Sequence, residues 1–154
     1  MAEQEIPGIE LEYVFSIRID FKERINMQGP RRDRVYVPPI GGDIWGPKLQ
    51  GRVVPYSGAD FASGGLLNAH YMLQADDGTW IYINNMGYLY ARDGSGTRLD
   101  DPSWGGDRDY YFRLTPYFDA PHGPHEWLND TVILGTGQRH ANPDHTIFTY
   151  YAVL

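Results

Sequence analysis

The stretch Asn68-Ala-His-Tyr-Met-Leu-Gln-Ala-Asp-Asp-Gly-Thr-Trp-Ile-Tyr-Ile-Asn-Asn-Met-Gly87 decides the fold. Two alternating runs flank Asp76-Asp77-Gly78, and an Asp-Gly pair between such runs is a strong signal for a β-hairpin. If Asp77 and Gly78 are the two central turn residues, His70 pairs with Asn85 across the ladder. The sequence therefore predicts a hairpin over residues 66–86.

This register sorts the hairpin into two rows, because successive side chains of a strand point to opposite faces. One row mixes polar and apolar residues: Asn68, His70, Met72, Gln74, Ile81, Ile83 and Asn85. The other row holds Tyr71, Leu73, Trp80, Tyr82 and Asn84. A mixed row behind a mostly apolar one suits a barrel whose interior takes a ligand.

Short alternating segments separated by Gly and Pro turns recur along the rest of the chain. They cover residues 10–20, 34–37, 48–55, 110–118, 127–139 and 145–154, and none keeps a helical period for more than two turns. We predict an all-β protein: a single, mostly antiparallel β-barrel over residues 10–154 with an enclosed, ligand-sized cavity, preceded by an extension at residues 1–9. The longest irregular stretch, residues 91–108, is a candidate lid or specificity loop.

Composition narrows the classes of function. The chain has 154 residues, enough for one core, and no cysteine, which excludes disulfides and thiol chemistry. A net charge of −7 argues against a nucleic-acid partner. No apolar run approaches the roughly 18 residues of a membrane span, and the N-terminus lacks a signal-peptide pattern. We therefore expect a cytoplasmic protein without a membrane partner.

Two residues are the first candidates for chemistry. His70 is either a satisfied interior histidine or a general acid or base, with Asn68 and Asn85 beside it to hold a substrate oxygen. Asp60 follows Ser57-Gly58-Ala59 and either caps backbone N–H groups of a turn or lies at the barrel mouth and orients His70.

Further candidates come from later strands. Arg113 lies in mid-strand and points either outward to solvent or inward, where it would favour a carboxylate, enolate or phenolate. Trp127 is either a pocket wall or a core plug. Tyr111 and Tyr82 are additional walls or donors, although the predicted register turns Tyr82 away from His70.

Metal chemistry finds little support in the sequence. His122 and His125 are separated by Gly123-Pro124, and no third ligand follows at a usual spacing. We therefore predict no metal site and no cofactor.

Several short motifs follow one another in a fixed order: Gly41-Gly42, Gly46-Pro47, Gly58-Ala59-Asp60, Asp76-Asp77-Gly78, Tyr111-Phe112-Arg113, Trp127-Leu128-Asn129 and Gly135-x-Gly137-x-Arg139. Together they resemble the domain of unknown function 3237 family over about residues 11–154. The resemblance implies a β-barrel and a homodimer. It implies no established activity, although similar members occur among catabolic and secondary-metabolite enzymes.

The resemblance also bears on the site. Asp60, Asn85, Arg113 and Asn129 match the family pattern and are carried over as pocket residues. At the positions of Asn68 and His70 the pattern more often has Asp and Arg. This departure implies a less charged substrate and a titratable group that the family norm lacks.

These observations predict a cofactor-independent enzyme, a proton-transfer isomerase, cyclase or lyase acting on an aromatic or polyketide-like oxygenated molecule. In this hypothesis His70 is the general acid or base, Asp60 orients it, and Arg113 stabilises an enolate or phenolate. Its substrate-binding residues are Asn68, Asn85, Tyr82, Tyr111, Trp127 and Asn129. The alternative is a non-catalytic small-ligand binding protein or a dimeric structural barrel. The position of His70 discriminates them, because a His70 that faces solvent or another subunit cannot act as the base.

Overall fold

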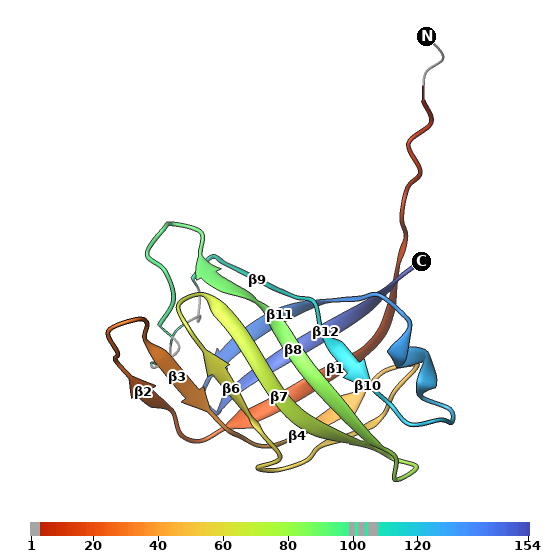
Figure 1. The fold of residues 1–154 in the computed structure, drawn as a ribbon, viewed down its shortest axis with the longest axis horizontal. Coiled ribbons are helices and arrows are strands. Elements are labelled where there is room, and N and C mark those ends of the chain that lie inside the picture. Colours follow the sequence, from red (N-terminus) through yellow and green to blue (C-terminus); the bar gives the residue numbers. More distant parts are fainter. Residues whose placement is uncertain (1–3, 99–100, 102–103, 105–107) are drawn as a thin grey trace.

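A computed structural model describes residues 4–98, 101, 104 and 108–154 (Figure 1). Residues 99–100, 102–103 and 105–107 of the candidate lid therefore lie outside the described residues. Within the described part, residues 4–10 are exposed and belong to no strand, and β1 begins at Leu11.

The described residues form a closed antiparallel barrel. Its strands follow the order β8-β9-β11-β12-β1-β4-β5-β7, and β7 pairs back with β8. Their bounds are β1 (Leu11–Phe21), β4 (Pro39–Trp45), β5 (Gly51–Val53), β7 (Leu66–Ala75), β8 (Trp80–Ala91), β9 (Tyr110–Leu114), β11 (Ile133–Ala141) and β12 (Asp144–Val153). The predicted all-β, mostly antiparallel barrel is confirmed. Closure leaves the long strands without free edges.

Short strands extend the barrel wall. β6 (Ala59–Ala62) pairs with β7 beyond the end of β5, and β3 (Arg34–Val37) and β2 (Ile25–Met27) follow it outward. On the other side, β10 (Tyr117–Asp119) pairs with β8 beyond β9. A one-turn 3₁₀-helix, η1 (Glu126–Asn129), connects β10 to β11.

The hairpin forms, but its predicted register was wrong by one residue. Ala75 pairs with Thr79 through a backbone hydrogen bond of 2.9 Å, so the loop is the three residues Asp76-Asp77-Gly78. Gly78 takes a φ of +88°, the left-handed conformation that such a three-residue loop requires. His70 therefore pairs with Asn84, and Asn85 pairs with Ala69.

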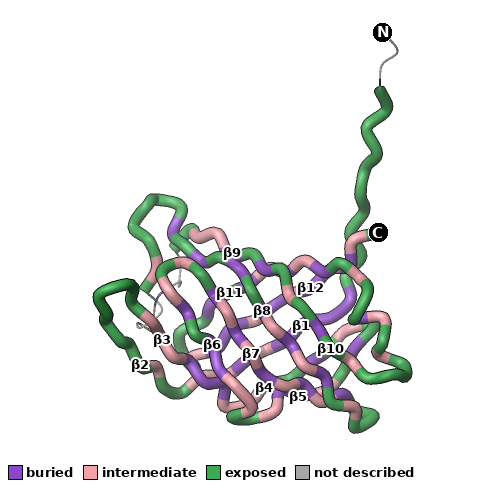
Figure 2. The backbone as a smooth tube through the Cα atoms, in the orientation of Figure 1, coloured by how far each residue is buried: buried purple, intermediate pink, exposed green. Residues whose placement is uncertain are grey.

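A slip of one residue exchanges the two faces of a strand. On β7 the buried, inward residues are Leu67, Ala69, Tyr71, Leu73 and Ala75, and on β8 they are Ile81, Ile83, Asn85, Gly87, Leu89 and Ala91. The alternation is visible along both strands (Figure 2). Asn68, His70, Tyr82 and Asn84 consequently lie on the outer face of the barrel.

The two ends of the barrel differ in packing. At the end near η1, aromatic rings fill the interior, with the centroids of Phe15 and Tyr150 5.1 Å apart and those of Phe15 and Phe118 6.0 Å apart. Leu128 of η1 is buried against them. At the opposite end, where β2 and β3 lie (left in Figure 1), the interior contains polar side chains and a pocket.

Within the described residues, no helix is long and apolar enough to cross a membrane.

Candidate functional site

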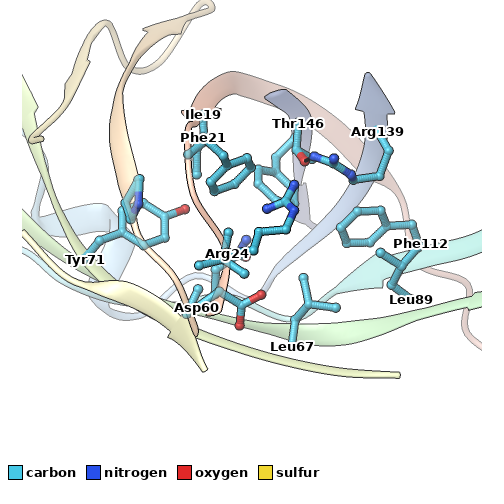
Figure 3. Close-up of a pocket in the computed structure, with 15 residues that line it drawn as sticks. Ile19, Phe21, Arg24, Asp60, Leu67, Tyr71, Leu89, Phe112, Arg139 and Thr146 are labelled. Carbon is cyan, nitrogen blue, oxygen red and sulfur yellow. Dashed lines mark hydrogen bonds between the residues drawn. The ribbon is translucent and has the colours of Figure 1, made fainter. Parts of the chain in front are cut away.

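A pocket occupies the barrel interior at the β2–β3 end (Figure 3). Most of its wall is apolar, and its polar lining residues are Arg24, Asp60, Asn85, Arg139 and Thr146, with the Tyr71 ring beside them. Its free volume is about 40 Å³, which holds only a few waters, at roughly 10–15 Å³ for each. A substrate of aromatic size would therefore extend through the mouth or displace side chains.

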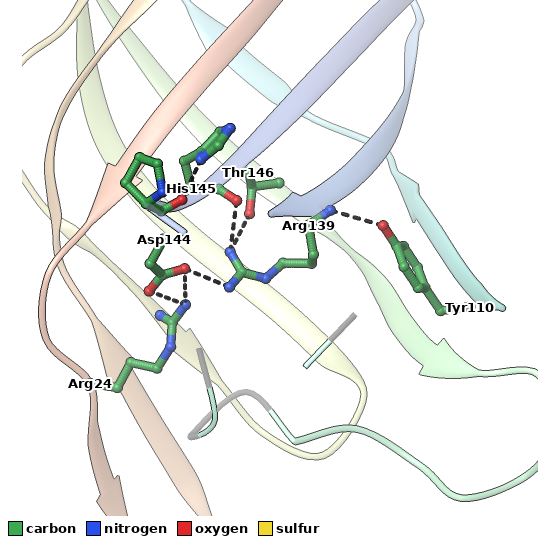
Figure 4. A network of polar contacts seen from close by, with 7 residues as sticks. Arg24, Tyr110, Arg139, Asp144, His145 and Thr146 are labelled. Carbon is green, nitrogen blue, oxygen red and sulfur yellow. Dashed lines mark hydrogen bonds and ion pairs between the residues drawn. The ribbon is translucent and has the colours of Figure 1, made fainter. Parts of the chain in front are cut away.

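Two arginines at this pocket share one carboxylate (Figure 4). The Asp144 carboxylate accepts from Arg24 Nη2 at 2.7 Å and from Arg139 Nη2 at 2.5 Å. Arg139 Nη1 also donates to Thr146 Oγ1 at 2.8 Å and to the His145 carbonyl at 3.1 Å. The side chains of Arg24 and Arg139 are only 7% and 4% exposed, so this network is fixed by burial as well as by charge.

The fold explains how these groups meet. Arg139 lies on the inward face of β11 near its end, and Asp144 starts β12 directly after the turn. The Phe21 ring packs under both guanidinium groups, 5.2 Å from Arg24 Cζ and 5.8 Å from Arg139 Cζ. Cation–π contacts of this kind hold a guanidinium in one orientation.

Asp60 is the carboxyl group of the pocket. It lies on β6, is 9% exposed, and its Oδ1 accepts the Asn68 backbone N–H at 3.0 Å. Burial raises the pKa of Asp60 to about 7, while the Asn68 N–H and the Arg24 guanidinium act in the opposite direction. An acid with a pKa near neutrality can both accept and donate a proton at physiological pH.

A second polar group lies deeper in the barrel. The hydroxyl oxygens of Tyr71 and Tyr150 and the Oδ1 of Asn85 are buried and have no hydrogen bond of good geometry among the described residues. Burial raises the pKa of both tyrosines, the Asp60 charge raises that of Tyr71 further, and Tyr71 raises that of Tyr150 further. These phenols therefore stay neutral, and Tyr71 and Asn85 have unused hydrogen-bonding capacity at the pocket wall.

Of the residues predicted from the sequence, Asp60 and Asn85 lie at the pocket. His70 and Asn68 do not, because the actual register turns both to the outer face. His70 Nδ1 lies 2.5 Å from the Tyr82 hydroxyl oxygen there, so Tyr82 is its partner and not a pocket wall. The expected contact of Asp60 with the His70 side chain is also absent: Asp60 hydrogen-bonds the Asn68 backbone instead.

The remaining predicted residues lie elsewhere. Arg113 is exposed on the outer face of β9, where its Cζ is 5.5 Å from the centroid of the Tyr111 ring. Trp127 packs against the core at the η1 end, 6.5 Å from the Phe15 ring centroid. Asn129 hydrogen-bonds both backbone groups of Ala120 and so fixes the loop before η1. None of the four lines the pocket.

Sequence reasoning missed Arg24, Tyr71, Arg139 and Asp144. For Arg139 a signal existed, because Ile133, Gly135, Gly137 and Arg139 share one face of β11, and that face is inward. For Tyr71 the signal was the apolar row Leu67-Ala69-Tyr71-Leu73. Arg24 lies in the β1–β2 connection, where no periodicity predicts a direction.

No cluster of three or more His, Cys, Asp or Glu side chains that could hold a metal ion occurs among the described residues. Among the residues that line the pocket, the polar groups are two guanidinium groups, one carboxyl group, an amide and hydroxyl groups. Such a set suits hydrogen bonding and proton transfer to an organic ligand.

The fold and the pocket define a class: a small antiparallel β-barrel protein with a small, mostly apolar pocket at one end that contains a few buried polar groups. Sequence comparison makes the assignment specific. The chain belongs to the family described as "Protein of unknown function (DUF3237)", whose model matches residues 9–153. The resemblance inferred from the ordered motifs is thus confirmed.

Relatives are similar along nearly their whole length. The UPF0311 protein RPA1785 of Rhodopseudomonas palustris is 30% identical over 155 residues, which cover 96% of this chain and 99% of that one. Its solved structure, of unknown function, has a TM-score of 0.80 at 28% identity and covers 97% of this chain and 100% of its own. A "beta-barrel like protein" of Acinetobacter baumannii also has a TM-score of 0.80, at 26% identity, covering 99% and 100% of the two chains.

A more distant structure is described as an enzyme. It comes from Penicillium herquei, is 17% identical, covers 99% of both chains and has a TM-score of 0.72. At this identity the similarity shows the fold alone.

Proposed function

We propose that the protein is a small-molecule enzyme that transfers a proton on an oxygenated substrate bound in the barrel pocket, with Asp60 as the general acid or base. The observation that carries the proposal is the environment of Asp60. This carboxyl group is buried in a mostly apolar pocket, its pKa is raised to about 7, and Arg24 lines the same pocket. Raised acid pKa values in pockets are typical of groups that exchange protons with substrates.

The proton transfer has a simple form. The Asp60 carboxylate removes a proton from the carbon next to a substrate carbonyl, the electron pair of that C–H bond forms a C=C bond, and the π pair of the C=O bond moves to the carbonyl oxygen. The resulting enolate oxygen is stabilised by the Arg24 guanidinium, which is positively charged and faces the pocket. Return of the proton from Asp60 to a different atom completes an isomerisation. The step requires no cofactor.

Asp60 thus takes the role that the sequence assigned to His70. Aromatic or polyketide-like molecules remain the proposed substrates, because apolar side chains form most of the wall. The Penicillium herquei neighbour supports an enzyme only in a general way, since it shows that this fold occurs in a protein described as an enzyme.

Hydrogen–deuterium exchange at carbon tests the proposal. The purified protein is incubated in D₂O near neutral pD with 2-tetralone, cyclohexanone or 2-hydroxyacetophenone, and loss of the α-proton signals is followed by NMR. We expect the protein to accelerate exchange of at least one ketone, and Asp60→Asn to lower the acceleration by about 100-fold or more.

Asp43→Asn is the matched control, since Asp43 is an exposed aspartate on β4 outside the pocket. Circular dichroism verifies that all variants are folded. A wild-type rate no faster than that of Asp60→Asn for every ketone would contradict the proposed proton transfer. Saturable binding of a ketone without exchange would favour the alternative, a non-catalytic small-ligand binding protein.

A further inference from the structure

The pocket wall contains a buried N–H donor of a charged group that has no acceptor among the described residues. Arg24 uses Nη2 to bind Asp144, but its Nε–H is buried and has no hydrogen bond among the described residues. The Arg24 side chain is 7% exposed, so water has little access to it. A buried donor of a cationic group is costly to leave unpaired, and its position at the pocket makes a ligand oxygen the natural acceptor.

Burial opposes the positive charge of Arg24. Asp144 contacts it directly, and Asp60 and Asp101 act on it through space. Burial and the neighbouring Arg139 outweigh these carboxylates, because the pKa of Arg24 is lowered from its ordinary value. A further negative charge beside Arg24 would therefore stabilise the guanidinium.

The other residues of the pocket indicate the shape of an anion that would bind beside Arg24. Leu67, Leu89, Phe112 and Phe148 form apolar walls, which suit a ring or a short hydrocarbon body. The Asn85 amide oxygen is a buried acceptor without a partner among the described residues. It suits a ligand hydroxyl or N–H at a distance from the anionic end.

We infer that the pocket binds a small organic anion, namely an apolar or aromatic molecule with one carboxylate, phenolate or enolate oxygen seated on Arg24 Nε and its body against the apolar walls. The inference rests on the proposed function, because it takes the pocket to be the substrate site. It differs from the expectation of a less charged substrate. That expectation came from Asn68 and His70, which lie on the outer face.

Anion binding is then linked to a proton on Asp60. The charged groups that face Asp60 are Arg24 and, beyond it, Arg139 and Asp144, with the Asp101 carboxylate also acting on Arg24. Tyr71 faces it from β7 as a neutral phenol. When a ligand anion binds Arg24, its negative charge offsets the guanidinium charge that stabilised the Asp60 carboxylate. The anion complex therefore takes up a proton near neutral pH, and affinity falls as the pH rises above about 7.

Calorimetry with benzoate and its neutral isostere benzamide tests this ligand class. We expect benzoate to bind at least about tenfold more tightly than benzamide, because only benzoate offers a charge-assisted hydrogen bond. Titrations at pH 7.4 in phosphate and in Tris, which differ in ionisation enthalpy, give the number of protons taken up. We expect uptake with the wild type and none with Asp60→Asn.

Arg24→Met is expected to abolish the preference for benzoate, and Arg31→Met, at an exposed arginine of the β2–β3 connection, to keep it. Because loss of Arg24 removes a buried ion pair and threatens folding, the Arg24 Nε–H NMR signal of the wild type provides a second measurement. Benzoate should shift this signal. Equal affinities for the two ligands, or no shift at saturating benzoate, would overturn the inference.

The two proposals fail separately. A preference for benzoate that depends on Arg24, combined with no exchange of ketone protons, keeps the ligand class and removes the role of Asp60 in proton transfer. Exchange that depends on Asp60, combined with equal binding of benzoate and benzamide, keeps the proton transfer and removes the anion.

Discussion

At the scale of single residues, Asp60 makes the stability of the fold depend on pH. The ordinary pKa of an aspartate side chain is 3.8, whereas the pKa of Asp60 is about 7 in the folded protein. The folded state thus holds the proton more tightly than the unfolded chain, and unfolding releases it between these two values. The contribution to stability is fully present below about pH 4, is lost as the pH rises to about 7, and amounts to up to ~4 kcal/mol.

Urea unfolding at pH 5 and pH 8 measures this effect. We expect the wild type to lose about 3 kcal/mol more than Asp60→Asn between the two pH values, since most of the titration of Asp60 falls in that interval. Asp43→Asn, which changes an exposed carboxylate, should behave like the wild type. Parallel losses in the wild type and Asp60→Asn would show that Asp60 titrates near its ordinary pKa.

A second residue, His70, provides the opposite prediction. Because its side chain lies on the outer face and contacts Tyr82, His70→Ala should keep benzoate affinity and ketone exchange within about twofold of the wild type. We expect a stability cost of about 1 kcal/mol from the lost hydrogen bond. A large loss of exchange in a folded His70→Ala variant would restore the histidine as the acid or base and contradict the placement of the site.

At the scale of elements, the hairpin shows what the sequence could predict and what it could not. Alternation and turn residues correctly predicted both strands of the hairpin, because these signals are local. The register depends on whether the loop has two or three residues, and Asp76-Asp77-Gly78 fits both. Matching the apolar rows would have favoured the three-residue loop, since Leu73 opposite Ile81 and Tyr71 opposite Ile83 place these four side chains on one buried face.

Gly137 of β11 carries a prediction about the pocket wall. A Cβ atom at this position would lie 2.6 Å from Phe112 Cδ2, and Phe112 lines the pocket. Gly137→Ala should therefore push the ring toward the pocket, lower benzoate affinity, and cost about 1–3 kcal/mol of stability, as overpacking usually does. Gly8→Ala is the matched control, because nothing lies within 4 Å of that position. Unchanged affinity and stability in Gly137→Ala would contradict this packing.

At the scale of the whole molecule, the aromatic core and the pocket lie at opposite ends of the barrel. Aromatic side chains fill the η1 end, whereas the β2–β3 end holds the buried arginines, Asp60 and the pocket. This division could not be predicted from the sequence, because Arg24, Asp60 and Arg139 are distant in the chain and meet only after the barrel closes. Asp60 and Asn85 were predicted from motifs, while their true partners depend on tertiary structure.

The outer face of β8 is unusually apolar for a free surface. Exposed aromatic and Met side chains gather on it, namely Trp80, Met86, Tyr88 and Tyr90. The outward positions of β7 and β8 carry no carboxylate, although the chain holds 20 acidic residues and a net charge of −7. Two copies can therefore approach through this face without strong repulsion.

Two buried acceptor atoms on the same face also favour an interface there. The Oδ1 atoms of Asn68 and Asn84 are buried there without a partner among the described residues. Asn84 pairs with His70 across the β7–β8 ladder, and Asn68 lies two residues before His70 on the same face of β7. A second copy facing them would supply donors as well as apolar contact, so we propose this face as the interface of the homodimer expected from the sequence.

Sedimentation velocity at about 50 μM tests this surface. We expect a dimer for the wild type and a monomer for Tyr88→Glu, because the substitution places a charge among the exposed aromatic side chains, where burying it without a partner is costly. Val132→Glu makes a similar change at an exposed position between η1 and β11 and should remain dimeric. The pocket faces the barrel interior, so monomeric Tyr88→Glu should still prefer benzoate to benzamide. A monomeric wild type, or a dimer that survives Tyr88→Glu, would show that this face does not join two copies.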